Sequence, residues 1–139
     1  MTSPTLRYLI DTNIWSALIR RSSPLLVARF SALALNQVFL SPIVWGELQV
    51  GYYKGDQTAQ RSQAIAHISA NSQLLVLDGA VSLAYAQLSA QLEQDGTPIG
   101  PNDTWIAAEA LCHQLVLVTD NTREFSRVNG LTVENWLLQ

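Results

Sequence analysis

Two short apolar runs of this chain each lead into an aspartate, and this feature constrains the fold more than any other. The mainly apolar run at 6–10 is followed directly by Asp11, and the run at 115–118 is followed by Thr119 and Asp120. Runs of this length are typical of buried strands. Because the carboxyl ends of parallel strands open onto the same edge of a sheet, the sequence predicts that the two aspartates lie close together.

The rest of the chain alternates between strand and helix patterns. Further short strands are predicted at 38–40 and 74–77, with an edge strand at 131–133. Amphipathic spacing and helix-start residues predict helices from about residue 14 and at 24–33, 42–51, 58–69, 80–92 and 104–112. This alternation favours the α/β class, and we expect a three-layer α/β/α domain with a central, mostly parallel sheet.

The size and composition of the chain exclude several classes of protein. The 139 residues are 48% hydrophobic and 14% charged, which excludes a disordered chain and fits one domain over 1–139. A single cysteine, Cys112, excludes a disulfide within a monomer. No apolar run is long enough to span a membrane and the first residues lack a signal-peptide pattern, so we expect a cytoplasmic protein with no membrane partner.

The charges are distributed unevenly. Eight Lys and Arg against eleven Asp and Glu give a net charge of −3, which argues against a protein that coats nucleic acid without selection. No Lys or Arg occurs between Arg61 and Arg123. Candidates for phosphate contacts are Arg20, Arg21, Lys54, Arg123 and Arg127, whereas Arg29 and Arg61 are explained equally well as solvated helix residues.

Four acidic residues stand in apolar surroundings and are the candidate site residues: Asp11, Glu47, Asp103 and Asp120. A carboxylate in such surroundings is costly unless it is paired or bound to a metal ion. The neighbouring sequence offers no Lys or Arg to pair with, so a cation is the expected partner. Hard divalent cations such as Mg²⁺ prefer oxygen ligands, and in a phosphodiesterase they activate water and neutralise phosphate charge.

Each of these acids has a structural explanation that remains open. Asp11 can cap a helix, and Glu47 can be an exposed helix residue. Asp103 can complement a helix dipole, and Asp120 can be an ordinary turn residue. Thr12 and Asn13 are interpreted as residues that cap a helix or orient carboxylates, not as ligands.

Four motifs in fixed order carry a resemblance to a known family. They are 9–13 (LIDTN), 41–48 (SPIVWGEL), 99–108 (IGPNDTWIAA) and 117–125 (LVTDNTREF), and the match continues to 130–136 (GLTVENW). In order, spacing and overall length the chain closely resembles the PIN-domain ribonuclease toxins called VapC. One such motif alone carries little weight, whereas four in order across the whole chain are specific.

The resemblance implies a function and a set of partners. It implies an endoribonuclease toxin that uses Mg²⁺ or Mn²⁺ to cleave RNA, forms a homodimer, and is neutralised by a cognate antitoxin of the VapB kind. Carried over by motif, Asp11, Glu47 and Asp103 are the acidic metal ligands and catalytic residues. For the fourth position the sequence offers Asp120, Asn121 and Glu124, and Asp120 is preferred because it lies nearest the strand end.

The same reading suggests how a partner inhibits the enzyme. A basic side chain of the antitoxin can take the place of metal among the acids. The first helices also carry more apolar residues than a small core needs, and an antitoxin segment can cover them: Trp15, Leu18, Ile19, Leu25 and Leu26. Packing in the core is the competing explanation. Trp15 and Trp45, which flank acidic motifs, are also candidates for stacking on an RNA base.

Two other function classes are weighed against the nuclease. A non-catalytic binding module of the same fold would be marked by a missing acid, and Asp11, Glu47 and Asp103 are all present. An aspartyl-phosphate enzyme needs a lysine near the phosphorylated acid, and the only lysine, Lys54, follows no predicted strand. Neither glycine-rich nucleotide-binding motif occurs.

Overall fold

A five-stranded sheet forms the centre of the computed structural model, which describes residues 5–138. The strand order is β3-β2-β1-β4-β5, and every pair of neighbours is parallel. The strands are β1 (Tyr8–Ile10), β2 (Val38–Leu40), β3 (Gln73–Leu74), β4 (Val116–Val118) and β5 (Val133–Glu134). The prediction of an α/β protein with a central parallel sheet is confirmed.

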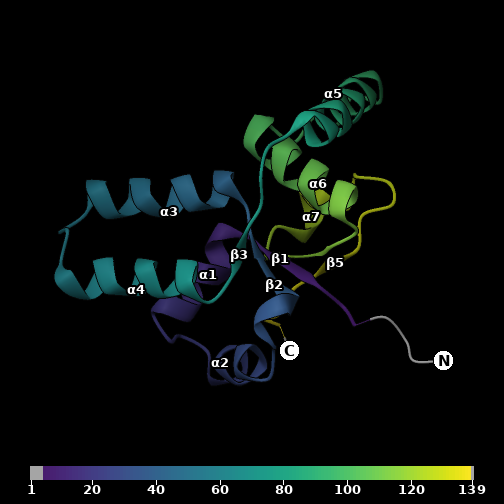
Figure 1. Ribbon diagram of the computed structural model, residues 1–139. Coiled ribbons are helices and arrows are strands. Elements are labelled where there is room, and N and C mark those ends of the chain that lie inside the picture. Colours follow the sequence, from purple (N-terminus) through teal and green to yellow (C-terminus); the bar gives the residue numbers. More distant parts are fainter. Residues whose placement is uncertain (1–4, 139) are drawn as a thin grey trace.

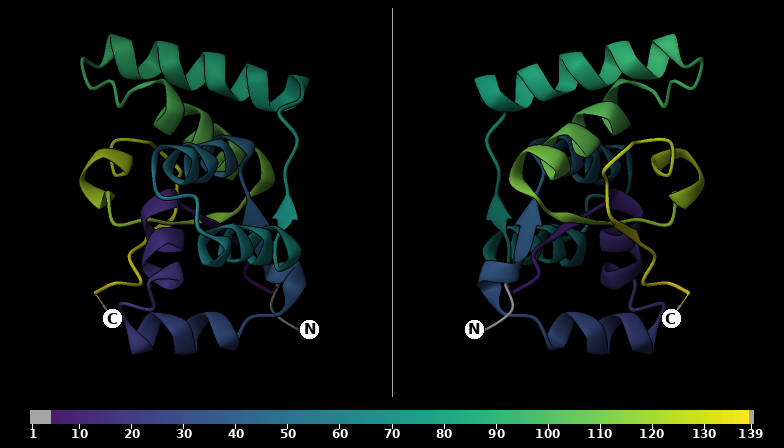
Figure 2. Two further views of the ribbon diagram at one scale, coloured as in Figure 1. Left: turned by 90° about the vertical axis from the view of Figure 1, so that its left-hand side faces the viewer. Right: turned by 90° about the vertical axis from the view of Figure 1, so that its right-hand side faces the viewer.

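Helices cover both faces of this sheet. They are α1 (Thr12–Ile19), α2 (Pro24–Ser31), α3 (Pro42–Lys54), α4 (Ala59–Ala70), α5 (Gly79–Gln94), α6 (Pro101–His113) and α7 (Thr122–Phe125), with a short 3₁₀ helix at Leu35–Gln37. Because crossovers between parallel strands are right-handed, α1 to α4 lie on one side and α5 to α7 on the other (Figure 1). Figure 2 shows α5 on the outside of the molecule, over α6.

The central strands are paired in a register that brings the two predicted aspartate loops together. Ile10 of β1 lies beside Val118 of β4, and both side chains are fully buried. The backbone N–H of Asp11 donates to the carbonyl of Val118 at 2.9 Å, so the pairing continues one residue past β1. The prediction that these strand ends are neighbours is therefore confirmed.

Two helices begin earlier than the sequence pattern indicates, and both carry site residues. Helix α1 begins at Thr12 with Asp11 as its cap, so Thr12 and Asn13 are its first residues and do not cap it. Helix α6 begins at Pro101, one turn before the predicted start. Gly100 precedes it with φ 90°, a conformation that glycine adopts without strain, and this places Asp103 within the first turn.

Other boundaries differ in the edge strands and short helices. Strand β3 ends at Leu74, so residues 75–77 of the predicted strand continue outside the sheet, with Val76 69% exposed. Strand β5 lies at Val133–Glu134, slightly later than predicted. Helix α7 and the 3₁₀ helix are too short to leave a periodic pattern in the sequence.

The start of α3 follows the predicted local chemistry. Pro42 occupies the first turn, and the Ser41 hydroxyl accepts hydrogen bonds from the backbone N–H groups of Ile43 and Val44, as a helix cap does. This fixes the direction in which α3 leaves the sheet and so positions Glu47.

Within residues 5–138, no helix combines the length and the apolar character that a membrane crossing requires.

Candidate metal-binding active site

The four predicted acids gather in one pocket at the carboxyl edge of the sheet. The pocket has a volume of about 390 Å³ and is lined by Asp11, Thr12, Asn13, Glu47, Asp103, Asp120 and Asn121. These residues come from the loop and helix after β1, from α3, from α6 and from the loop after β4. Residues that are distant in the sequence therefore meet at the position where ligands bind in open parallel sheets.

Asp11 is the most buried of these acids, with 8% of its surface exposed. One carboxylate oxygen accepts the backbone N–H of Thr12 at 2.8 Å, and the other accepts the hydroxyl of Thr119 at 2.7 Å. Burial raises the pKa of Asp11, and the charges of Glu47 and Asp120 raise it further, against the lowering effect of the two hydrogen bonds. Asp11 therefore caps α1 and faces the pocket at the same time, so its two interpretations are compatible.

Glu47 reaches the pocket from the second turn of α3. Its Oε1 atom accepts a hydrogen bond from the hydroxyl of Thr12 at 2.8 Å, across the contact between α1 and α3. The side chain is half-buried, so the interpretation of Glu47 as an ordinary exposed helix residue is wrong. Thr12 holds a carboxylate in place, which confirms its predicted orienting role.

Asp103 lies in the first turn of α6 and is half-buried. Burial raises its pKa to about 6, with further contributions from the charges of Asp11, Glu124 and Glu47. The start of a helix favours a negative charge, so the α6 dipole opposes this shift in part. Repulsion between these neighbouring negative charges would be relieved by a bound cation.

The residues offered for the fourth position occupy different places. Asp120 lines the pocket on its exposed side and accepts a hydrogen bond from the Asn13 amide at 3.2 Å. Asn121 also lines the pocket, and its amide donates to Glu124 at 3.2 Å. Glu124 does not line the pocket, although its charge raises the pKa of Asp103.

The donor atoms of the pocket suit a hard divalent cation. Its lining offers carboxylate, hydroxyl and amide oxygens and contains no Lys, Arg or His. Within residues 5–138, no group of three or more Asp, Glu, His or Cys side chains is arranged to hold a metal ion. Mg²⁺ would therefore bind here through fewer of these side chains and complete its shell with water and substrate phosphate, which it commonly does.

Sequence reasoning missed two buried polar residues next to the site. Thr119, fully buried, donates to Asp11 and also accepts the backbone N–H of Asn121 at 3.0 Å. Its position directly after β4 was a usable signal.

Glu109 of α6 is fully buried and accepts the Ser41 hydroxyl at 2.5 Å, and burial raises its pKa to about 7. Its sequence neighbours gave no such signal.

The fold and the pocket together define a class of protein: an all-parallel α/β domain that gathers acidic side chains where its central strands end. The PIN domain family matches residues 8–131 of this chain. The chain therefore belongs to the PIN-domain family, and the relatives described next place it in the VapC branch.

Two characterised relatives match almost the whole chain. The protein is 32% identical over 130 residues to Ribonuclease VapC1 of Haemophilus influenzae (strain R2866), covering 93% of this chain and 97% of that protein. It is 33% identical over 131 residues to the tRNA(fMet)-specific endonuclease VapC of Shigella flexneri, covering 94% and 98%.

A solved structure gives the same result in three dimensions. The crystal structure of VapBC2 from Rickettsia felis, bound to a DNA fragment from its promoter, contains a chain with a TM-score of 0.87 to this protein. The two chains are 31% identical, and the match covers 94% of this chain and 99% of that one. The resemblance found in the four motifs therefore extends to the whole fold.

Proposed function

We propose that this protein, as one PIN domain over 1–139, is the toxin of a toxin–antitoxin pair and a divalent-metal-dependent endoribonuclease that acts in the cytoplasm. The single observation that carries this proposal is the pocket in which Asp11, Glu47, Asp103 and Asp120 meet without a basic residue. The non-catalytic alternative requires the loss of an acid, and none of the four is missing. The names of the two relatives, a ribonuclease and a tRNA-specific endonuclease, support the choice of RNA as substrate.

In this proposal Asp11 and Asp103 are the firmest ligands of Mg²⁺ or Mn²⁺, with Glu47 and Asp120 completing the acidic set. A divalent ion held there supplies a more acidic water and neutralises charge that develops on the phosphate. The hydrogen bonds from Thr12 and Thr119 keep Glu47 and Asp11 directed at the pocket. Such partners orient ligands and raise their affinity for metal.

The acids of the pocket also take part in proton transfer in this proposal. Hydrolysis joins a water oxygen to phosphorus and breaks the bond between phosphorus and the leaving ribose oxygen. The proton that the attacking water loses passes to a carboxylate of the pocket, which acts as a general base, and the leaving ribose oxygen takes up a proton from solvent water. The pocket is open to solvent on the side of Asp120, so both water and an RNA strand have access.

The test is cleavage of total bacterial RNA by purified protein freed of antitoxin, with Mg²⁺, Mn²⁺ or EDTA. Asp11→Asn and Asp103→Asn should abolish metal-dependent cleavage. Glu93→Gln, which changes an exposed carboxylate on α5, is the matched control and should cut normally. Intact RNA under every condition, with folding confirmed by thermal melting, would establish the non-catalytic reading instead.

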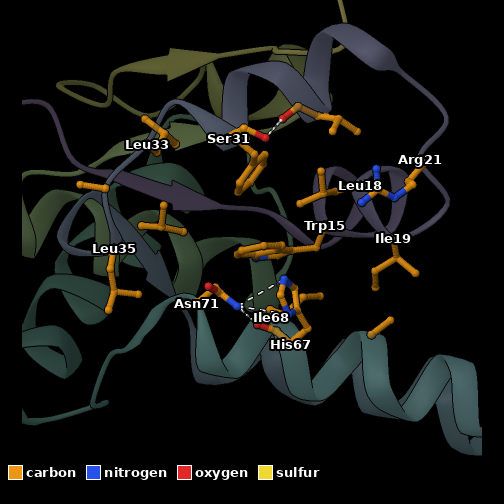
Figure 3. A pocket seen from close by; sticks show the side chains of 15 residues that line it. Trp15, Leu18, Ile19, Arg21, Ser31, Leu33, Leu35, His67, Ile68 and Asn71 are labelled. Carbon is orange, nitrogen blue, oxygen red and sulfur yellow. Dashed lines mark hydrogen bonds between the residues drawn. The ribbon is translucent and has the colours of Figure 1, made fainter.

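We also propose that a VapB-type antitoxin docks in the apolar hollow between α1, α2 and α4. This hollow has a volume of about 500 Å³, and Figure 3 shows Trp15 pointing into it from α1, beside His67 of α4. Leu18 and Ile19 line it and are half-exposed. Leu26 is fully buried and belongs to the core, so the expectation that it is free to contact an antitoxin is wrong. Trp15 is only 2% exposed, which argues against its stacking on RNA.

In this proposal a basic antitoxin side chain also enters the acidic pocket in place of metal. Leu18→Asp should weaken binding of a VapB-type antitoxin, measured by calorimetry, while Val50→Asp, which changes an exposed residue of α3 outside the hollow, should not.

We further propose that the protein forms a homodimer. Large apolar side chains are exposed beside and on α5, including Val76 at 69% and Leu83 at 61%. Exposed apolar side chains that gather in this way are typical of contact surfaces between chains. Sedimentation should show a dimer that Leu83→Glu dissociates, and a monomeric wild-type protein would contradict this proposal.

A further inference from the structure

A second hollow adjoins the acidic pocket and has the opposite electrostatic character. It lies between α1, α3 and α4 and has a volume of about 380 Å³. Thr12 and Glu47 line both hollows, so the two are adjacent. We call this hollow the arginine groove, because Arg20, which directly follows α1, and Arg61 of α4 line it, together with Ser16, Gly51 and Tyr52.

The charges of the two arginines are not neutralised within the protein. The one ion pair in the described part of the chain joins Arg29 to Glu134 at 3.3 Å, on other elements. Within residues 5–138, the guanidinium groups of Arg20 and Arg61 have no hydrogen-bond or ion-pair partner. Two exposed guanidinium groups in one hollow make a site for an anion, and phosphate matches their geometry.

The chain leaves space for one of these groups. Gly55, at the end of α3, has φ −95°, which any residue adopts. A Cβ atom at Gly55 would lie 2.5 Å from Nη1 of Arg61. The Arg61 guanidinium therefore lies directly against Gly55 at the end of α3.

An aromatic ring lies in the same groove and is held in place. The Tyr52 hydroxyl donates to the carbonyl of Gln57 at 3.4 Å, and the ring packs edge-on against Tyr53 with 5.2 Å between centroids. Tyr52 is half-buried and lines the groove beside the arginines. A fixed aromatic ring next to cationic groups is the combination with which proteins bind single-stranded nucleic acid.

We propose that the arginine groove binds the nucleotide next to the cleaved phosphodiester bond of the RNA. Arg20 and Arg61 bind the phosphate of this nucleotide, and its base stacks on Tyr52. The inference rests on the proposed nuclease function, because the acidic pocket must hold the phosphate that is cut. The arginine groove explains how an acidic site binds a polyanion, because its two arginines attract a neighbouring phosphate that is not cut.

An acidic segment of the antitoxin is the competing occupant of the groove. The position of the groove next to the acidic pocket favours RNA, since a strand whose phosphate lies among the acids has its next nucleotide near the groove. The apolar hollow between α1, α2 and α4 already offers the antitoxin a separate surface. Binding of the antitoxin is therefore measured in parallel with binding of RNA.

The experiment uses the full-length protein freed of antitoxin, with Asp11→Asn in every variant so that RNA stays intact. Labelled total bacterial tRNA is the probe, and its dissociation constant is measured by filter binding at several salt concentrations. Arg20→Gln together with Arg61→Gln should weaken binding about tenfold or more and lower the salt dependence by roughly one to two counterions. Arg7→Gln removes one charge at the opposite end of β1, as each single variant Arg20→Gln or Arg61→Gln does in the groove, and should have little effect.

Tyr52 is tested with a pair of variants. Tyr52→Leu removes the ring and should weaken tRNA binding about tenfold, whereas Tyr52→Phe keeps the ring and should bind normally. Equal effects of Arg7→Gln and of each single groove variant, Arg20→Gln and Arg61→Gln, would overturn the proposal, because only total charge would then matter. A double variant that loses antitoxin and keeps tRNA would assign the groove to the antitoxin and also overturn the proposal.

The groove and the nuclease function can fail separately. If the protein with aspartate at position 11 cuts RNA, and its arginine variants cut and bind RNA normally, the nuclease proposal stands and the proposal for the groove is wrong. If the protein never cuts RNA but binds tRNA through Arg20 and Arg61, the nuclease proposal is wrong and the groove still binds RNA. In the supporting case the arginine variants raise KM for RNA and leave kcat nearly unchanged.

Discussion

Two regions of this molecule hold carboxylates away from water, and they differ in access and in their neighbours. In the acidic pocket, Asp11 and Asp103 share an open hollow with other acids. Glu109, farther along the same helix as Asp103, is sealed in the core with one hydroxyl as its partner. Burial is the main cause of the raised pKa in all three residues.

The difference teaches which observation points to function. A raised pKa reports burial, and Glu109 shows that burial alone does not make an active site. Its bond with Ser41 joins α6, which carries Asp103, to the cap of α3, which carries Glu47. The pair therefore acts as a structural tie between two elements of the site, whereas clustering of acids in an open hollow marks the site itself.

The largest contrast is expected from neutralising one acid in each region. Asp103→Asn should reduce RNA cleavage at least about 100-fold, because it removes a proposed metal ligand. The same change should raise the melting temperature in EDTA, since it removes one of several like charges. Glu109→Gln should leave cleavage within a few-fold of wild type. Equal losses of activity in both variants would remove the distinction between the regions.

The second prediction concerns the pH dependence of stability. The pKa of Glu109 is about 7 in the folded protein against 4.5 for the ordinary side chain. Between these pH values the unfolded chain loses the proton and the folded chain keeps it, so stability falls as pH rises. The expected loss is about 3 kcal/mol, fully developed above pH 7.

Glu109→Gln removes this titration and supplies the measurement. The free energy of unfolding of the variant minus that of the wild type, from urea denaturation in EDTA, should increase by about 3 kcal/mol between pH 4.5 and pH 8. The pH dependence of this difference is independent of any fixed cost of the amide. A difference that stays constant with pH would mean that Glu109 ionises normally inside the fold.

The acidic pocket could be predicted from the sequence because its residues obey local rules. Asp11 and Asp120 follow apolar strands, and parallel pairing brings such strand ends together. Ser41 and Pro42 predict the start of the helix that carries Glu47. Acids in apolar surroundings without basic neighbours then indicate a cation, and the four motifs indicate the family.

The buried pair and the grooves could not be predicted in this way. Glu109 looks like any helix residue until packing of α6 on the core shows that it faces inward. The sequence left a solvated helix face as an equal explanation for Arg61, and only the packing of α4 brings it to the same hollow as Arg20. The early start of α6 depended on Gly100, whose backbone conformation the sequence does not reveal.

Within the acidic pocket, the effect of losing an orienting hydrogen bond should decrease toward solvent. Thr12→Val keeps the shape of the side chain and removes the hydroxyl that donates to Glu47 at 2.8 Å. We expect cleavage to fall about tenfold and the concentration of Mg²⁺ needed for half-maximal activity to rise. Thr12→Ser, which keeps the hydroxyl, should restore both values, and an inactive Ser variant would show that the methyl group matters instead.

The smallest effect is expected on the exposed side of the pocket. The Asn13 amide donates to Asp120 at 3.2 Å, and both side chains are exposed, so water replaces this bond at little cost. Asn13→Ala should change the cleavage rate less than about threefold, because Asp120 stays hydrated and keeps its charge. A larger loss than in Thr12→Val, measured in the same cleavage assay, would mean that Asn13 contacts metal or RNA itself. In that case the exposed side of the pocket, and not its buried wall, would be where geometry limits the reaction.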